Sequence, residues 1–185
     1  MAETRPQRLV FAAVAVVAVL AGTSLWLATS PPPRLAAPDI SSSALFAAGF
    51  HDLQGASRSL GEFQGKVLVL NFWATWCAPC REEMPAFSRL QAAWAARNVQ
   101  FVGLSSEDPP KVAAFARSLG VTYPLWVGGD EVEELSRRLG NVTGALPHTL
   151  VLDRSGRVVA AKVGAYTETA LTAVLENASV ESSPK

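Results

Sequence analysis

The feature that most constrains the fold is an apolar run that leads directly into a pair of cysteines and then into a helical pattern. The run "KVLVLNFWA" covers residues 66–74 and is rich in β-branched side chains. Such a run is typical of a strand that is covered on both faces. Cys77 and Cys80 follow it, and apolar side chains then recur at three- and four-residue steps across residues 81–97. This spacing predicts an amphipathic helix, with the apolar positions Met84, Phe87, Leu90, Ala93 and Trp94.

The rest of the chain continues the alternation of strands and helices. A weakly alternating segment at residues 50–60 predicts an edge hairpin. Further strands are expected at 99–106 and 122–127, helices at 107–120, 130–140 and 167–177, and a strand hairpin at 148–164. A central β–α–β alternation implies parallel strands with helices on both faces of the sheet. The predicted fold class is therefore α/β, with a mixed sheet that is closed by antiparallel strands.

The first thirty residues differ from the rest. Residues 9–28 form an uncharged apolar run preceded by Arg5 and Arg8. Its length matches the ~20 residues that an α-helix needs to cross a bilayer, and the arginines favour a cytoplasmic N-terminus. A cleaved signal peptide is the alternative, although its apolar region usually spans only about 7–15 residues. The anchor interpretation places the chain in a bacterial inner membrane as a single-pass protein, with its catalytic domain in the periplasm.

These patterns divide the chain into five segments. The segment after the anchor is rich in Pro, Ser and Ala, which is typical of a semi-extended spacer. The remaining residues suit one domain with one core. The expected segments are a cytoplasmic N-terminus (1–8), a transmembrane anchor (9–28), a linker (29–43), the folded domain (44–178) and a flexible C-terminal tail (179–185).

Composition excludes one class of partner. Lysines plus arginines number 16 and aspartates plus glutamates number 16, so the formal net charge is zero. The sequence has no basic patch of the kind that nucleic-acid binding requires. We therefore expect no nucleic-acid partner.

The close spacing of Cys77 and Cys80 argues against a purely stabilising disulfide. A bridge across two intervening residues closes a very short loop, and the stabilisation from loop closure grows with loop length. Zinc needs about four ligands. His51 and His148 could complete a set on paper, but neither has ligand spacing to the cysteines. No metal site is expected, and the inert staple and the metal site stay open as alternatives.

A cysteine pair between a buried strand and a helix is a strong redox signal. Cys77 lies where the helix should begin, and the unpaired N–H groups and positive dipole end there stabilise a thiolate. We therefore predict that Cys77 is the nucleophile. Cys80, one turn further along, should be less exposed and act as the resolving thiol. Pro79 between them has no N–H and a fixed φ, which should stiffen the first turn.

The segment "NFWATWCAPCREEMP", residues 71–85, resembles the active site of the thioredoxin superfamily, in its membrane-anchored TlpA/ResA-like branch. The segment "GALPHTLVLDRSGRVV" is similar to the second signature of that branch, and the resemblance covers roughly residues 46–178. It implies the thioredoxin fold, with a TlpA-like insertion and an N-terminal hairpin. It also implies that the Leu146–Pro147 bond is cis and packs against the cysteine pair.

The resemblance also suggests roles for residues near the pair. In ResA-type proteins a glutamate at the position of Glu83 acts in the active site. A carboxylate there could shuttle the proton of Cys80 if burial raises its pKa, whereas Glu82 is expected to be a surface acid. Ordinary thioredoxins carry a buried aspartate at the position of Asn71. Because asparagine cannot titrate, Asn71 is expected to be a structural hydrogen-bonder.

Three aromatic positions receive separate interpretations. Trp76, next to Cys77, is expected in an exposed apolar docking surface, and Trp73 is expected in the core. His148 stands where threonine is usual in the family. It could bias Cys77 if it were protonated, and the simpler alternative is that it is an ordinary strand residue.

The function expected from these features is that of a membrane-tethered thiol–disulfide oxidoreductase. Its redox group would be the Cys77–Cys80 disulfide, with no other cofactor. The resemblance points to a reductant that takes electrons from a transmembrane thiol reductase. Its clients would be exported disulfide-containing proteins, such as apocytochrome c or proteins with copper-site cysteines. A thiol peroxidase of the same fold and a non-enzymatic metallochaperone or haem-binding module are the alternatives.

Overall fold

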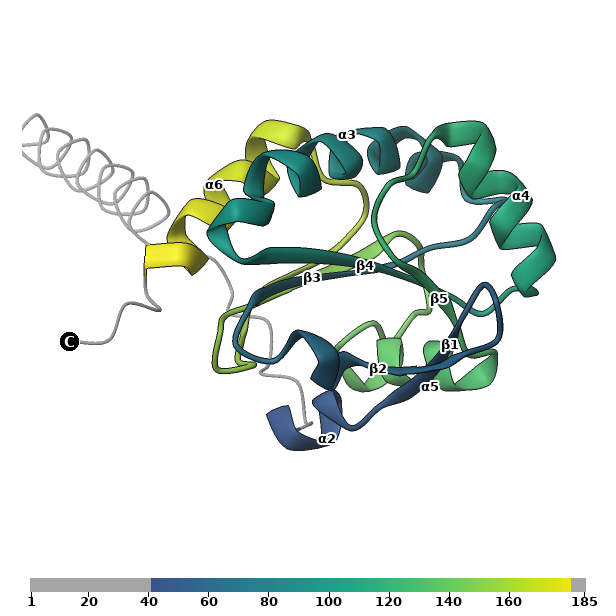
Figure 1. Ribbon diagram of the computed structural model, residues 1–185, viewed down its shortest axis with the longest axis horizontal. Coiled ribbons are helices and arrows are strands. Elements are labelled where there is room, and N and C mark those ends of the chain that lie inside the picture. Colours follow the sequence, from purple (N-terminus) through teal and green to yellow (C-terminus); the bar gives the residue numbers. More distant parts are fainter. Residues whose placement is uncertain (1–40, 181–185) are drawn as a thin grey trace, which may run out of the picture. The chain divides into compact units, whose positions relative to one another are not determined.

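A computed structural model of the chain describes residues 41–180, which form an α/β domain around one seven-stranded sheet (Figure 1). The order of the strands in the sheet is β2-β1-β5-β4-β3-β6-β7. The elements are α2 (Ser42–Phe46), β1 (Gly49–Asp52), β2 (Ser57–Ser59), the 3-10 helix η1 (Leu60–Phe63), β3 (Val67–Phe72), α3 (Ala78–Trp94), the 3-10 helix η2 (Ala95–Arg97), β4 (Val99–Ser105), α4 (Pro109–Leu119), β5 (Leu125–Val127), α5 (Asp130–Arg138), β6 (His148–Leu152), β7 (Val158–Val163) and α6 (Glu168–Val180).

The sheet is mixed, as the alternation of strands and helices predicted. Strand β3 pairs in parallel with β4 and antiparallel with β6, and β4 pairs in parallel with β5. The hairpin strands β1 and β7 add antiparallel neighbours at β5 and β6. In this register Asn71 of β3 lies opposite Gly103 of β4 on one side and Thr149 of β6 on the other. Residues far apart in the sequence thus meet at the end of β3 that leads to the cysteines.

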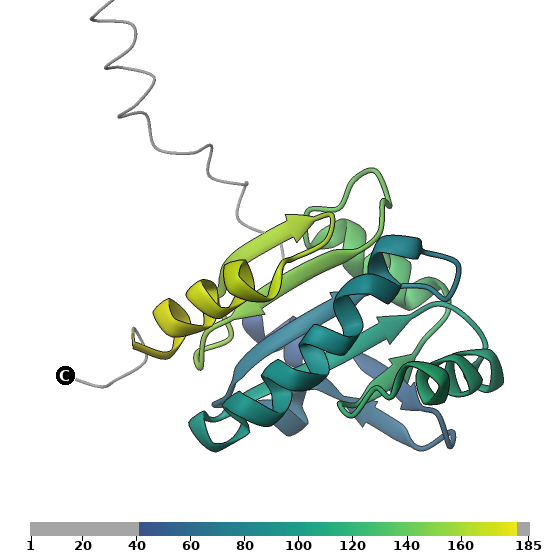
Figure 2. The ribbon, with the colours of Figure 1, turned by 90° about the horizontal axis from the view of Figure 1, so that it is seen from above.

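Helices cover both faces of the sheet. Helices α3, α4 and α6 lie over one face, and α2 and α5 lie on the other (Figures 1 and 2). All six residues of β3 are buried, because alternate side chains enter one core or the other. Val67 and Val69 belong to the core beneath α3, whereas Leu68, Leu70 and Phe72 belong to the opposite core. The continuous apolar run of this strand follows directly from its two-sided burial.

Helix α3 begins directly after Cys77 and positions the cysteine pair. A proline in its first turn lacks only an N–H that has no partner inside the helix. The helix continues through Pro85 to Trp94. Its apolar face is buried as predicted, except that Ala93 is exposed. The large buried side chains of this face are Met84, Phe87, Leu90 and Trp94. Met84 and Phe87 are fully buried, and each such side chain contributes about 1.5–3 kcal/mol.

Two helices separate β4 from β6, in agreement with the predicted insertion. Helix α4 ends at Gly120, whose φ of 64° is the left-handed conformation that glycine adopts without a steric penalty. Helix α5 has acidic residues in its first turn and arginines in its last, which suits the helix dipole. The chain then returns through a loop to β6, so that α5 and this loop border the active-site end of the sheet.

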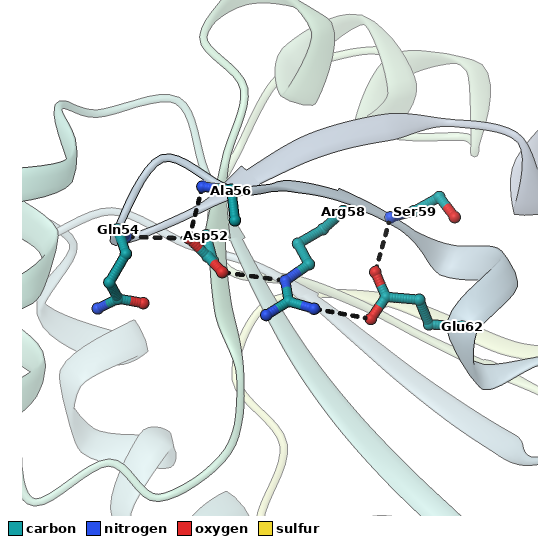
Figure 3. Close-up of polar contacts among 6 residues, drawn as sticks. All are labelled: Asp52, Gln54, Ala56, Arg58, Ser59 and Glu62. Atoms are coloured by element: carbon teal, nitrogen blue, oxygen red, sulfur yellow. Dashed lines mark hydrogen bonds and ion pairs between the residues drawn. The ribbon is translucent and has the colours of Figure 1, made fainter.

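The predicted edge hairpin is formed by β1 and β2, and a buried carboxylate holds its turn (Figure 3). Asp52 accepts hydrogen bonds from the backbone N–H groups of Gln54 and Ala56 and from Nε of Arg58. Arg58 also pairs with Glu62. The bond from the Ala56 N–H is the main reason that the pKa of Asp52 lies below its ordinary value, against the effect of burial. This network fixes the short hairpin at the end of the sheet that is remote from β3.

The described domain is slightly longer than the predicted one. Helix α2 begins at Ser42, inside the predicted linker, because the hydroxyl of Ser41 caps it by accepting the Ala44 N–H. Helix α6 continues to Val180, two residues into the predicted tail, with Ala178 buried against the core. The predicted cytoplasmic segment and anchor, most of the linker, and residues 181–185 lie outside the described residues. Between residues 41 and 180 no helix is long and apolar enough to cross a bilayer.

Candidate active site

The two cysteines form a disulfide at the N-terminus of α3. The S–S distance is 2.05 Å, and Cys77 is the residue that caps the helix. The backbone N–H of Cys80 points at Sγ of Cys77, with 3.3 Å between nitrogen and sulfur. Both side chains are largely covered: Cys77 is 4% exposed and Cys80 is 0% exposed. The prediction that Cys80 is less exposed than Cys77 is thus confirmed. Pro79, which lies between them, is exposed.

Glu83 lies one helical turn beyond Cys80 on the same buried face of α3 and is only 3% exposed. Its Oε1 accepts a hydrogen bond from Nδ2 of Asn71 at 2.8 Å, and its Oε2 accepts one from the backbone N–H of Tyr166 at 2.9 Å. Burial raises the pKa of Glu83 to about 7, although these two hydrogen bonds and the positive charge of Lys162 oppose that rise. The predicted proton-shuttling role of Glu83 requires that burial raises the pKa of its carboxyl. The pKa is raised in this way.

Asn71 bridges Glu83 to the neighbouring strand. The same Nδ2 group donates to Oγ1 of Thr149 at 2.9 Å, across the β3–β6 register. The prediction that Asn71 is a structural hydrogen-bonder is confirmed. Its side-chain oxygen, Oδ1, is buried and has no hydrogen-bond partner among residues 41–180.

The loop before β6 completes the site. The Leu146–Pro147 peptide bond is cis, as the resemblance implied. Leu146 packs against the core cluster that contains both cysteines. The carbonyl oxygen of Pro147 accepts the N–H of Gly164, with 2.8 Å between the atoms, which ties the loop to the end of β7. The loop therefore contributes one apolar side chain to the cluster in which the cysteine pair is buried.

The two tryptophans near the pair differ as predicted. Trp73 is 2% exposed and lies in the core beneath α3, whereas Trp76 is 69% exposed. Trp76 borders a pocket that Leu146 and the α5 residues Val132 and Ser136 also line. An exposed indole, next to Cys77 in the chain, and an apolar loop residue thus line the same pocket.

His148 is a buried strand residue, in agreement with the simpler of its two interpretations. Its ring stacks on Phe72, with 5.4 Å between the ring centroids, and Nδ1 shares a hydrogen bond with Oγ of Ser136 at 3.0 Å. Burial lowers the pKa of His148 to about 4. The imidazole is therefore neutral at neutral pH and supplies no positive charge.

The sequence matches the AhpC/TSA family over residues 34–161, well over half of the chain. The chain belongs to the AhpC/TSA family of thioredoxin-like proteins. It is 32% identical over 127 residues to the thiol-disulfide oxidoreductase ResA of Geobacillus thermodenitrificans, covering 68% of this chain and 71% of the relative. It is 34% identical over 119 residues to the thioredoxin-like protein YneN of Bacillus subtilis, covering 63% and 67%.

A solved structure agrees with this membership. The crystal structure of a thiol:disulfide interchange protein from Chlorobium tepidum superposes with a TM-score of 0.63 at 29% identity, covering 71% of this chain and 92% of that one. Within the AhpC/TSA family, the relatives together with the Cys77–Cys80 disulfide show that this protein is a thiol–disulfide oxidoreductase of the thioredoxin fold.

One contact of this AhpC/TSA protein could not be anticipated from the sequence. Glu107, just after β4, accepts hydrogen bonds from the backbone N–H and the hydroxyl of Thr75, and Lys111 pairs with it. No local pattern joins Thr75 to a residue so distant in the chain. The hydrogen-bond partners of Glu83, Asn71 and the Tyr166 N–H, were not predicted from the sequence either. For Asn71 a signal exists, because the alternation of Val69 and Asn71 along β3 indicates that both side chains face α3.

The histidines do not join the cysteines. His51 is exposed on β1, at the hairpin end of the sheet, and His148 is buried on β6. Within residues 41–180 no three His, Cys, Asp or Glu side chains are grouped so that they could hold a metal ion. The chemistry that the described residues offer is disulfide exchange at Cys77 and Cys80.

Proposed function

We propose that this protein reduces the disulfides of exported client proteins, with Cys77 as the nucleophile, Cys80 as the resolving thiol and Glu83 as the proton carrier. The observation that carries the proposal is the juxtaposition on α3: a redox disulfide at the helix N-terminus and a buried carboxyl one turn further along. The described disulfide is the oxidised end state of the cycle.

In the first step the Cys77 thiolate attacks one sulfur of the client disulfide. A bond forms between Cys77 and that sulfur, and the other client sulfur leaves as a thiolate. The Cys80 N–H, which points at Sγ of Cys77, and the positive end of the helix dipole favour the thiolate over the thiol. The product is a mixed disulfide between protein and client.

In the second step Cys80 releases the client. Its thiol gives a proton to the Glu83 carboxylate, and the resulting thiolate attacks Sγ of Cys77. The mixed disulfide breaks, the second client sulfur leaves as a thiolate, and the Cys77–Cys80 disulfide forms. A carboxyl with a pKa of about 7 can accept this proton and then give it to a leaving thiolate at neutral pH. The client gains two electrons from the protein and one proton by way of Glu83. Its other thiolate takes a proton from solvent, into which the Cys77 proton was released when the thiolate formed.

The exposed surface beside Cys77 suits a polypeptide client. Trp76, next to Cys77 in the chain, is exposed, and it lines a pocket together with Leu146. Tryptophan is common among the residues that dominate binding at protein interfaces. Trp76, Pro79, Leu146 and Pro147 are thus proposed to hold the client while the cysteines react.

The proposed cell location rests on the N-terminal sequence. The proposed electron donor rests on the proposed direction of the reaction, from this protein to its clients. The apolar run at residues 9–28, preceded by arginines, supports a single-pass anchor in a bacterial inner membrane with the domain in the periplasm. In an oxidising compartment, the Cys77–Cys80 disulfide that forms in each cycle must be reduced again by an electron donor. A transmembrane thiol reductase is the proposed donor, and apocytochrome c or copper-site cysteines are the proposed clients.

A single-turnover assay tests the proposal. Reduced protein mixed with a disulfide-bonded client peptide should lose two thiols as the peptide gains two. Cys77→Ser should abolish the reaction, whereas Cys80→Ser should trap a mixed disulfide through Cys77. Glu83→Gln should slow the second step and remove its dependence on pH near 7. Unchanged reduction by Cys77→Ser would overturn the proposal.

The reduction potential of the pair, measured against glutathione, tests the direction. A value near or below about −200 mV supports a reductant, and one near −120 mV would make the protein an oxidant. Two further outcomes would favour other functions. Peroxide consumption without preference for a dithiol donor would indicate a peroxidase. Stoichiometric metal that is lost in Cys77→Ser would indicate a metallochaperone.

A further inference from the structure

Only the NH₂ half of the Asn71 carboxamide makes hydrogen bonds among the described residues. Its Nδ2 donates to Glu83 and to Thr149, whereas its Oδ1 is buried and has no partner among the described residues. Leaving a buried acceptor unpaired costs about 1–3 kcal/mol. Such a group therefore calls for an explanation, particularly next to the carboxyl that is proposed to change its protonation state.

The other partner of Glu83 determines where a proton can go. The Tyr166 N–H is a backbone donor and can never accept, so it keeps Oε2 of Glu83 as an acceptor. A proton taken up by Glu83 therefore resides on Oε1, the oxygen that faces Asn71. In the described orientation, an O–H on Oε1 would point at the Nδ2 donor, which cannot accept it.

We propose that the carboxamide of Asn71 turns over when Glu83 takes up a proton, and that Asn71 and Thr149 form a two-state hydrogen-bond relay for this carboxyl. With ionised Glu83, Nδ2 donates to Oε1 and to the Thr149 hydroxyl, as described. With protonated Glu83, Oδ1 takes the place of Nδ2 and accepts from the Glu83 O–H. The Thr149 hydroxyl then changes from acceptor to donor.

The chemistry of these two side chains suits them to this role. A carboxamide presents a donor and an acceptor on one rotatable group, and a hydroxyl can do either. Each state pairs one half of the Asn71 amide and leaves the other half unpaired. The number of hydrogen bonds is therefore equal in the two states, and the protonation of Glu83 decides the orientation of the amide. The two states can then exchange with the movement of a single proton. Asn71 is thus a positioning residue that serves both forms of Glu83, and this inference rests on the proposed proton-carrying role of Glu83.

The neighbouring titratable groups do not compete for the proton. The positive charge of Lys162 acts on Glu83, and its Nζ donates to the carbonyl oxygen of Ala165. Burial and the charge of Glu83 raise the pKa values of Tyr123 and Tyr166, so both phenols stay protonated near neutral pH. The disulfide-bonded cysteines do not titrate. In the oxidised protein, Glu83 is therefore the group in this cluster whose charge changes near pH 7.

NMR of the oxidised wild-type protein tests the relay without any catalysis. The Glu83 Cδ shift and the Asn71 side-chain NH₂ shifts should titrate with one midpoint. The NOEs between the Asn71 NH₂ protons and the Thr149 side chain should be present above that midpoint and lost below it. NH₂ shifts and NOEs that stay constant while Glu83 titrates would overturn the proposal.

A variant gives a second measurement. Asn71→Leu keeps the size of the side chain but removes the donor to ionised Glu83, so the proton affinity of Glu83 should increase about tenfold, since such a bond contributes more to the charged form. Glu82→Gln, an exposed neighbour on the same helix, is the control and should leave the midpoint unchanged. An unchanged Glu83 midpoint in Asn71→Leu would also overturn the relay.

The relay and the proposed function fail separately. If Asn71 and Glu83 titrate together but Glu83→Gln reduces clients at the wild-type rate, the relay stands and the catalytic role of Glu83 falls. If Glu83→Gln is slow but the Asn71 amide does not respond to pH, the relay falls and the catalytic role stands.

Discussion

Glu107 holds Thr75 with two hydrogen bonds, one from the backbone N–H to Oε2 at 2.5 Å and one from the hydroxyl to Oε1 at 2.9 Å. Thr75 lies in the loop between β3 and Cys77, and Glu107 lies in the segment that follows β4. The carboxylate thus ties the loop that carries Trp76 and Cys77 to the adjacent strand of the sheet.

The first prediction concerns this contact. Glu107→Gln replaces one acceptor oxygen by a donor, so one of the two bonds from Thr75 and the ion pair to Lys111 are lost. We expect a loss of about 1 kcal/mol in the free energy of unfolding at pH 7. Urea denaturation of Glu107→Gln and of the exposed control Glu82→Gln measures it. Equal stabilities for the two variants would contradict the prediction.

The pH dependence of that loss has a definite sign. Burial raises the pKa of Glu107, but the bonds from Lys111 and Thr75 outweigh it and hold the pKa below its ordinary value. A carboxylate with a lowered pKa stabilises the fold above the pKa of the unfolded chain, and this contribution is lost as pH falls through the folded value. The difference between wild type and Glu107→Gln should therefore shrink in acid.

The second prediction separates client docking from chemistry. Because Trp76 is exposed, Trp76→Ala should change the free energy of unfolding by no more than about 0.5 kcal/mol. Reduction of a disulfide-bonded client peptide should nevertheless fall about tenfold in kcat/KM, as for a tryptophan that anchors an interface. Reduction of a small aromatic disulfide should be little affected. Val180→Ala, an exposed apolar residue at the end of α6, is the control and should behave as wild type.

The third prediction uses two buried groups whose pKa values move in opposite directions. His148 has a pKa of about 4 in the folded protein against an ordinary 6.5, so the unfolded chain binds its proton first as pH falls. Stability from this residue therefore rises with pH between about 4 and 6.5. Glu83 has a pKa of about 7 against an ordinary 4.5, so its contribution falls with rising pH between about 4.5 and 7.

Single variants should reveal each contribution. Each shift corresponds to about 3 kcal/mol at most, so the two largely cancel in the wild-type profile. Glu83→Gln should make the stability of the oxidised protein rise clearly from pH 4.5 to 7, whereas His148→Phe should make it fall. Urea unfolding across this range measures both slopes. Parallel profiles for all three proteins would show that neither pKa is shifted.

The fourth prediction concerns the packing beneath the site. A Cβ added to Gly103 of β4 would lie 2.5 Å from Cδ2 of Leu125 and 3.1 Å from Nε1 of Trp73. Gly103→Ala should therefore cost about 1–3 kcal/mol through overpacking. The companion Gly103→Ala/Leu125→Ala should recover part of that loss relative to Leu125→Ala alone. No recovery in a double-mutant cycle would show that the clash lies elsewhere.

The order of strands and helices could be predicted from the sequence because each element carries a local signal. The two-sided burial of β3, the apolar face of α3 and the left-handed Gly120 all follow from neighbouring residues. The cysteine pair and the cis bond at Pro147 were likewise predictable, the latter through a family resemblance.

The partners of the site residues could not be predicted in this way. Glu83 meets a backbone N–H 83 residues away, and Asn71 meets a hydroxyl 78 residues away. Such contacts depend on which strands become neighbours, and no local pattern encodes that. His148 shows the same limit: its burial on Phe72, and hence its lack of charge, follows only from the β3–β6 register.

The two-sided burial of β3 has a further consequence. Asn71 and Phe72 are adjacent in the chain but face opposite cores, so the redox centre with Glu83 and the imidazole of His148 are kept apart by the sheet itself. The sheet thus separates two buried titratable groups, Glu83 on one face and His148 on the other. On the far side, His148 can therefore be replaced to increase acid tolerance without removing a hydrogen bond of Glu83 or a residue that lines the pocket beside Trp76.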